Sequence, residues 1–358
     1  PDQDRVYWEA FFVALPVFCG YAALFGMQHH VKAKYGIKDD ASAASYDFSF
    51  AISMVYFGNL VIRFGHKVVF CWMTPRCRVF LAMGCMACAM LMIAVLIFIL
   101  DSYDLRWVVA SYLIGGISVG TFEANILGCL TSLGGRTKQI AITAIPAGIA
   151  CVLIGGFFFM GPPVDLPAPF IYIAVALLNF VGMIVMAVRI PDAAPDSPNF
   201  EFCAPLHKLA ADLRNYRKWL PQMWHFAIAS TIDMFMLSAF APGMVPYVYD
   251  GATVAIAPGV ALRTDSFMAI ANVGNMCGGF VGRWLSYRVQ PRHPLLYCAC
   301  SVAGVAVLLS WVPVLAPFGM FFVLMGDGLI YGTISRHIDA AVPQEFNLIA
   351  ISAWLFIG

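Results

Sequence analysis

The sequence predicts an all-α polytopic membrane protein with about 11 transmembrane helices, arranged as two bundles of six and five. Its composition gives the first reason: of 358 residues, 61% are hydrophobic and only 11% are charged. The mean hydropathy is +0.81. A soluble domain has roughly 25% charged residues, so this chain cannot cover itself with a polar surface. It therefore requires lipid as its solvent.

The number of long apolar runs is the second observation, since a helix needs roughly 20 apolar residues to cross a bilayer. Six such runs precede the first long polar segment of the chain. They predict spans at residues 6–28, 46–64, 79–100, 107–130, 139–160 and 167–188. Residues 1–189 are therefore expected to form a six-helix bundle.

Residues 190–217 are predicted to form a cytoplasmic linker. The segment begins with IPDAAPDSPNF, which is rich in turn-forming residues. It continues with APLHKLAADLRNYRKWL, in which apolar residues recur at helical spacing beside a basic face. Such a helix is expected to lie on an anionic membrane surface.

Residues 218–358 are predicted to form the second bundle, of five helices. The expected spans are 219–245, 266–287, 295–315, 317–335 and a last one that begins near Phe346. The chain is still apolar at Gly358 and begins with Pro1 rather than Met. We therefore expect residues beyond both ends, and a last helix that continues past Gly358.

The distribution of basic residues predicts that the N-terminus is cytoplasmic, because cytoplasmic loops carry an excess of Lys and Arg. With that orientation, 16 of the 21 Lys and Arg residues fall on the cytoplasmic side. The other five are Lys32, Lys34, Lys38, Arg106 and Arg263.

Several classes of function are disfavoured by the sequence. It has no GxSxG, HExxH, Walker or strand-associated GxGxxG motif, so an enzyme or an ATP-driven pump is not expected. Cys85 and Cys88 form a CxxC, but it lies inside the apolar run AMGCMACAML. Cysteine there behaves as a small hydrophobe, so no metal or cofactor is predicted. The net charge of +1 gives no reason to expect a nucleic-acid partner.

The eighth span, ANVGNMCGGFVGRWLSY, holds the first candidate residues. Gly274, Gly278 and Gly282 are four residues apart and share one helical face, which allows another helix to approach closely. Arg283 follows this stripe, and a charge so placed needs a partner, a cavity or the membrane edge. Asn275 lies within the stripe and either contacts substrate or forms a hydrogen bond between helices.

Other polar residues fall in the middle of predicted spans, where ionisable groups are unfavourable and mark functional sites. Glu123 and Asn125 lie in GGISVGTFEANILG, Asp233 in HFAIASTIDMFMLSAF and Asp327 in FVLMGDGLIYG. We predict that these residues and Arg283 bind a substrate, a proton or each other. The alternative is that they form structural hydrogen bonds between helices.

The six-plus-five plan resembles the equilibrative nucleoside transporter family, and so do local patterns. Gly282-Arg283 is similar to the family's G-R, although Gly279 stands where the family carries an acid. Asp327-Gly328 is similar to its N-G, and PQEFNLIAISAWLFIG to its P-x-E-x-E-T-A-G region. The family's P-W-N is absent from the first span, which reads ALFGMQHH.

The resemblance implies a carrier of nucleosides or nucleobases that works by alternating access, facilitative or coupled to protons. The expected partners are then the lipid bilayer, a nucleoside-like small molecule and, if a carboxylate takes up a proton in each cycle, protons. The plan is also major-facilitator-like, so a transporter of another small solute is an alternative. A transport-inactive membrane subunit of a larger complex is the third.

Overall fold

The computed structural model describes residues 6–37, 42–70, 72–131, 133–160, 164, 166–191, 204–240, 253–289 and 294–357. The chain divides into two compact units. One comprises Pro1–Val152 with Asp165–Leu209, and the other comprises Leu153–Val164 with Ala210–Gly358. The predicted boundary between the bundles falls partly on residues 192–203, outside the described ranges, and stays a prediction.

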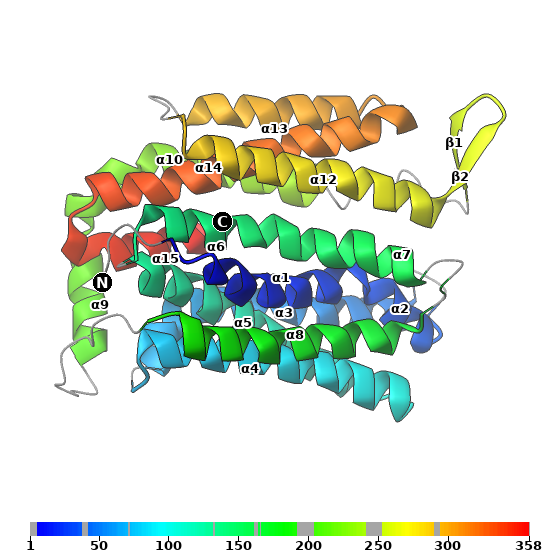
Figure 1. Ribbon diagram of the computed structural model, residues 1–358, viewed down its shortest axis with the longest axis horizontal. Helices are drawn as coiled ribbons and strands as arrows, with labels where there is room; N and C mark the ends of the chain where they lie inside the picture. The colour runs from blue at the N-terminus through cyan, green and yellow to red at the C-terminus, as the bar shows by residue number, and fades with distance from the viewer. Residues whose placement is uncertain are drawn as a thin grey trace. The chain divides into compact units, whose positions relative to one another are not determined.

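Helices make up the first unit, and each predicted span corresponds to one of them (Figure 1). They are α1 (Glu9–Gly26), α2 (Gln28–Lys34), α3 (Ala43–Val69), α4 (Pro75–Met92), α5 (Leu105–Thr131), α6 (Gly135–Ala150) and α8 (Ala168–Arg189). Two spans continue as π-helices, α4 into η1 (Ile93–Ile99) and α6 into η2 (Cys151–Gly156). The short α2 was not predicted.

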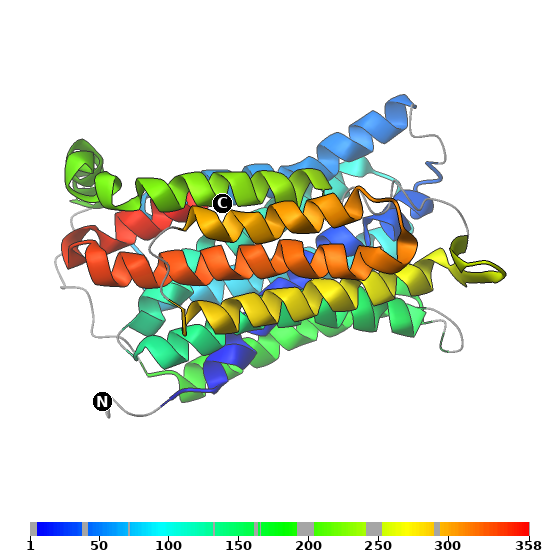
Figure 2. The same ribbon diagram turned by 90° about the horizontal axis from the view of Figure 1, so that it is seen from above.

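The second unit holds the last five spans and one β-hairpin (Figures 1 and 2). Its elements are α7 (Phe157–Met160), α10 (Tyr216–Phe240), β1 (Thr253–Ala257), β2 (Val260–Arg263), α12 (Thr264–Ser286), α13 (Leu295–Leu308), α14 (Ala316–Ala341) and α15 (Asn347–Ile357), with 3₁₀ turns η3 (Pro313–Leu315) and η4 (Gln344–Phe346). The hairpin, which pairs Thr253 with Arg263 and Val254 with Leu262, adds to the all-α plan. A helix, α9 (Ala204–Arg214), lies in the predicted linker.

Local sequence explains where several helices begin and end. The hydroxyl of Thr74 accepts a hydrogen bond from the Cys77 amide, and Pro75 occupies the first turn, so α4 begins there. The ninth span was predicted over 295–315 but α13 ends at Leu308. The prediction was wrong beyond that point because Val312 precedes Pro313 and takes an extended conformation, φ −94° and ψ 111°.

Short contacts hold α2 to the loop that follows η1. The Lys34 ammonium pairs with Asp101. The hydroxyl of Tyr35 donates a hydrogen bond to the carbonyl of Asp104 at 3.0 Å. Partial burial raises the pKa of Tyr35 to about 12. These contacts tie α2 to the loop between η1 and α5.

Six helices of the described chain are long and apolar enough to cross a membrane by length and composition. They span 9–26, 75–99, 105–130, 135–160, 168–189 and 313–341. The helices α3, α10 and α12 have 27, 25 and 23 residues but more polar sequences. At about 1.5 Å per residue, each is still long enough for a bilayer core of about 30 Å.

The contact between α12 and α14 depends on glycine. The two helices lie side by side in Figures 1 and 2. A Cβ placed on Gly274, Gly278 or Gly282 would lie under 3.0 Å from a carbonyl oxygen of α14, those of Pro317, Phe321 and Met325. The predicted glycine stripe is therefore the surface on which the two backbones touch.

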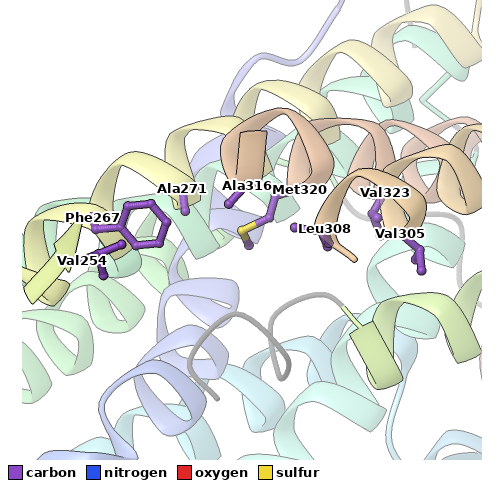
Figure 3. Close-up of a cluster of buried hydrophobic side chains, with 8 residues drawn as sticks. All are labelled: Val254, Phe267, Ala271, Val305, Leu308, Ala316, Met320 and Val323. Atoms are coloured by element: carbon purple, nitrogen blue, oxygen red, sulfur yellow. The ribbon is translucent and has the colours of Figure 1, made fainter. Parts of the chain in front are cut away.

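An apolar cluster fills the space near the hairpin in the second unit. Figure 3 shows its eight buried side chains, Val254, Phe267, Ala271, Val305, Leu308, Ala316, Met320 and Val323. They come from β1, α12, α13 and α14. This packing fixes the helices that carry the charged residues described below.

Replacing Gly278 by leucine should destabilise the second unit by about 1–3 kcal/mol or more, because the side chain would occupy the position of the Phe321 backbone. The matched control is Gly128→Ala on α5, where nothing lies within 4 Å of an added Cβ. That change should leave the thermal unfolding midpoint in detergent unchanged or slightly higher. Equal midpoints for the two variants would contradict the close-contact account.

Candidate functional site

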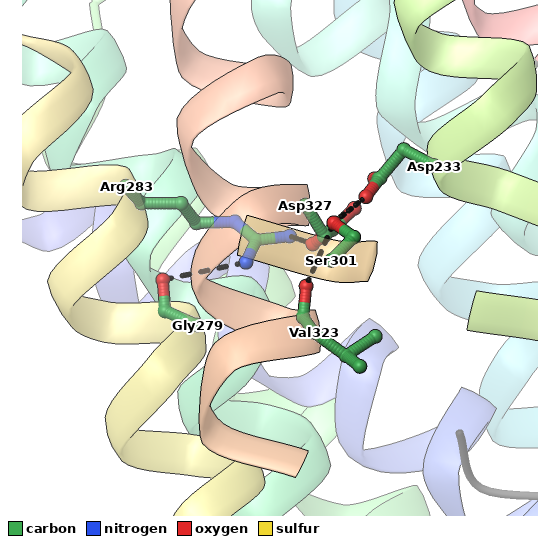
Figure 4. A network of polar contacts seen from close by, with 6 residues as sticks. All are labelled: Asp233, Gly279, Arg283, Ser301, Val323 and Asp327. Atoms are coloured by element: carbon green, nitrogen blue, oxygen red, sulfur yellow. Dashed lines mark hydrogen bonds and ion pairs between the residues drawn. The ribbon is translucent and has the colours of Figure 1, made fainter. Parts of the chain in front are cut away.

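Arg283 and Asp327 form a buried ion pair between α12 and α14 (Figure 4). The Nη2 atom of Arg283 lies 3.1 Å from Oδ2 of Asp327, and each side chain is only 6% exposed. Nη1 of Arg283 also points to the carbonyl of Gly279 at 3.4 Å. The guanidinium carbon lies 5.3 Å from the centre of the Tyr331 ring. Arg283 is thus a buried, partnered charge and not an exposed anchor at the membrane edge.

Glycine places this pair as well. A Cβ on Gly328 would lie 2.8 Å from the amide nitrogen of Arg283, and one on Gly282 would lie 3.0 Å from Cα of Gly328. The two backbones therefore touch directly beside the charged groups. With the backbones this close, the side chains of Arg283 and Asp327 reach each other inside the packed interface.

Asp233 joins the same region from α10. The hydroxyl of Ser301 on α13 donates a hydrogen bond to Oδ1 of Asp233 and lies 3.5 Å from the Val323 carbonyl of α14. Asp233 is 1% exposed and Ser301 is fully buried. Asp233 also lies within electrostatic range of Asp327 and Arg283. Four helices, α10, α12, α13 and α14, therefore contribute to one polar cluster, shown in Figure 4.

The charges of this cluster, defined as Asp233, Arg283, Ser301 and Asp327, do not balance. Two carboxylates face one guanidinium among the described residues. Uncompensated charge is strongly unfavourable in a low-dielectric interior. A proton, a cation or a cationic group of a solute would neutralise the excess negative charge.

One hydrogen-bond donor of the cluster also lacks an acceptor among the described residues. Nε of Arg283 is buried and has no hydrogen-bond partner among the described residues. Burying such a donor without an acceptor is unfavourable by about 1–3 kcal/mol. An incoming oxygen acceptor would therefore gain a charge-assisted hydrogen bond there.

The first unit holds a second ion pair that the sequence analysis did not predict. Nη2 of Arg63 on α3 lies 2.8 Å from Oε2 of Glu123 on α5. Glu123 was a predicted site residue, whereas Arg63 was counted only as a cytoplasmic charge at the end of the span 46–64. Because α3 continues to Val69, Arg63 lies within the helix and not at its end.

Both pairs occur at equivalent places in their own units. Each joins the second long helix of its unit to the fourth, α3 to α5 and α12 to α14. A Cβ on Gly116 or Gly120 of α5 would meet the carbonyl oxygens of Val55 and Asn59 on α3. The first unit therefore shows the same combination of a glycine-mediated helix contact and an arginine–carboxylate pair.

The two predicted asparagines do not join the cluster. Nδ2 of Asn125 donates to the carbonyl of Thr121 in its own helix at 2.6 Å. Nδ2 of Asn275 lies 3.5 Å from Oδ1 of Asn272, also in its own helix. Both contacts stay within a single helix, so they are not the hydrogen bonds between helices that were the predicted alternative. Their predicted role in substrate binding stays a prediction.

Comparison with solved structures finds proteins of the same architecture. The crystal structure of the peptide transporter POT in complex with sulfate aligns with a TM-score of 0.67 at 13% identity, covering 98% of this chain and 85% of that chain. A D-xylose-proton symporter gives 0.65 at 14% identity, with 98% and 86% covered. A POT family transporter in complex with 5-aminolevulinic acid gives 0.66 at 11%, also with 98% and 86% covered. Neither the protein-family models nor the curated protein sequences give a match.

Identities of this size show the fold alone. The chain is an integral, multi-pass membrane protein with a major-facilitator-like fold. The predicted fold class is confirmed at this level. The cytoplasmic location of the N-terminus stays a prediction from the distribution of Lys and Arg.

Truncating Asp327 to alanine should destabilise the protein by about 3–5 kcal/mol, because it leaves a buried guanidinium without its partner. The double variant Arg283→Met with Asp327→Leu should lose much less, since it removes both charges. Unfolding in detergent measures both. The exposed pair supplies the control, and Lys34→Ala should change the unfolding midpoint little. An effect of Asp327→Ala as small as that of Lys34→Ala would contradict the buried pair.

Proposed function

We propose that the chain is a secondary carrier that moves a small polar solute across the membrane by alternating access. The observation that carries the proposal is the buried cluster of Asp233, Arg283, Ser301 and Asp327 within a major-facilitator-like fold. Ionisable groups inside membrane proteins are unfavourable and mark solute or ion pathways. A purely structural role is a weaker explanation, because apolar residues of similar volume often stabilise as well as a buried ion pair.

Arg283 is the proposed solute-binding group. Its Nε has no acceptor among the described residues, and an arginine fork suits carboxylate, phosphate or carbonyl oxygens. The Tyr331 ring lies beside the guanidinium and supplies an apolar surface. The solute is therefore expected to present an oxygen acceptor to Arg283 next to a flat or apolar group.

Protons are the proposed coupling ion. The cluster carries one carboxylate more than its guanidinium balances, and a proton on Asp233 or Asp327 removes the excess charge. A solute that binds Arg283 would weaken the ion pair between Arg283 and Asp327. Asp327 would then bind a proton more readily, which links solute binding to proton binding. A cationic group on the solute is the alternative source of the missing charge.

Two classes of solute are candidates: one like the solutes of the fold neighbours, and nucleosides or nucleobases. The fold neighbours include carriers of peptide and xylose and one that binds 5-aminolevulinic acid, which favours a major-facilitator-type solute of that kind. The nucleoside candidate is supported by the resemblance at Gly282-Arg283 and Asp327-Gly328. These two positions pack on each other in the second unit.

Uptake into proteoliposomes tests the proposal. Labelled adenosine, uracil, a dipeptide, xylose and 5-aminolevulinic acid are supplied with and without an inward proton gradient. We expect saturable uptake of at least one, accelerated by the gradient and slowed by a proton ionophore. Absence of saturable uptake of all five by folded protein would contradict the proposal and favour a transport-inactive subunit.

Arg283→Ala and Arg283→Lys should both reduce uptake to the level of protein-free liposomes, because a lysine cannot reproduce the fork of donors. The matched control is Arg288→Ala at the exposed end of the same helix region, where Arg288 stacks on Trp284. Uptake by that control should equal uptake by the wild type. Normal uptake in either Arg283 variant would exclude it as the solute-binding group.

Asp233→Asn should leave uptake down a solute gradient intact but remove its response to the proton gradient, because the amide cannot bind the coupling proton. Asp212→Asn on α9 serves as the control and should respond as the wild type does. The readout is the ratio of initial uptake rates with and without the gradient. A ratio unchanged in Asp233→Asn would place the proton elsewhere.

A further inference from the structure

A pair of thiols in the first unit has no role in the charged site. Cys19 lies on α1 and is fully buried, whereas Cys151 begins η2 and is exposed. The two thiols lie within interaction range of each other. Both residues fall near the middle of their predicted spans, 6–28 and 139–160.

The backbones around the two cysteines are also close. A Cβ on Gly148 of α6 would lie 2.7 Å from the carbonyl oxygen of Leu15 and 3.0 Å from the amide nitrogen of Cys19. Cys151 follows Gly148 by three residues, so it lies on the same face of the helix. The two helix backbones therefore touch beside the cysteines, and such close approach is a condition for a disulfide, whose Cα atoms usually lie about 4.4–6.8 Å apart.

The local helix geometry singles out Cys151. The α-helix changes to a π-helix at this residue, and such segments occur frequently at functional sites. Cys85 and Cys88, by contrast, both lie on α4. Cys19 and Cys151 instead lie on two different helices and are 132 positions apart in the sequence.

We propose that Cys19 and Cys151 form a dithiol site that closes to a disulfide when the protein meets a small, membrane-permeant organic disulfide. The inference is independent of the proposed transport function. Closure would join α1 covalently to the fifth span and restrict movement of one against the other. The site is expected to react with apolar organic disulfides.

The reaction proceeds by two exchanges. Cys151, the exposed member, loses its proton and attacks one sulfur of the reagent, whose S–S bond breaks and releases one small thiol. Cys19 then loses its proton and attacks the sulfur of Cys151, which releases the second small thiol. Two protein thiols are oxidised by two electrons in total, the reagent disulfide is reduced, and the two protons end on the two released thiols.

The test uses the full chain in detergent, treated with 4,4′-dithiodipyridine and then blocked with N-ethylmaleimide. Peptide mapping by mass spectrometry without reductant should find the Cys19 peptide linked to the Cys151 peptide. The link should be lost in Cys151→Ser and retained in Cys88→Ser. Separate mixed disulfides or maleimide adducts at Cys19 and Cys151, with no linked peptide, would overturn the proposal.

Thermal unfolding provides a second measurement that does not depend on mapping. Oxidation should raise the unfolding midpoint of the wild type, and dithiothreitol should reverse the rise, because the link constrains the unfolded chain. The midpoint of Cys151→Ser should not change with either reagent. A wild-type midpoint that responds no more than that of Cys151→Ser would also overturn the proposal.

Discussion

The second unit depends on one constraint, the direct contact of the α12 and α14 backbones. Glycines at every fourth position of α12 remove the side chains that would separate the helices. Arg283 comes at the end of that stripe, where Gly328 faces its backbone. The guanidinium is consequently buried, and the carboxylate of Asp327 is the group that compensates its charge. Asp233 and Ser301 extend the same network to α10 and α13.

The first unit repeats this arrangement with the glycines on the other helix. Gly116 and Gly120 of α5 lie against α3, and Glu123 follows them as the partner of Arg63. In each unit a charged pair bridges the second and fourth long helices. Such a bridge adds to the glycine-mediated contact only while both charges are present, so a change in protonation or a competing solute group would weaken it. This is the physical link between binding and movement that the proposed carrier requires.

Much of the fold could be predicted from composition and apolar run length. Mid-membrane charge also singled out Arg283, Asp327 and Asp233, because an ionisable group there needs a partner, and the structure brings these three side chains together. The partner of Arg283 could not be identified from sequence: Gly279 occupies the local position one turn earlier, and Asp327 lies 44 residues away. Arg63 was missed for a different reason. An arginine at the end of an apolar run looks like an interfacial residue, and only the longer α3 places it inside.

The buried cluster, on this proposal, serves transport and is not required for folding. Solute uptake by the doubly neutral variant Arg283→Met with Asp327→Leu, compared with wild type at equal amounts of folded protein, tests it most directly. We expect a folded protein that shows no uptake above that of empty liposomes. Uptake at the wild-type rate would contradict the account and would leave the cluster as a structural contact between helices.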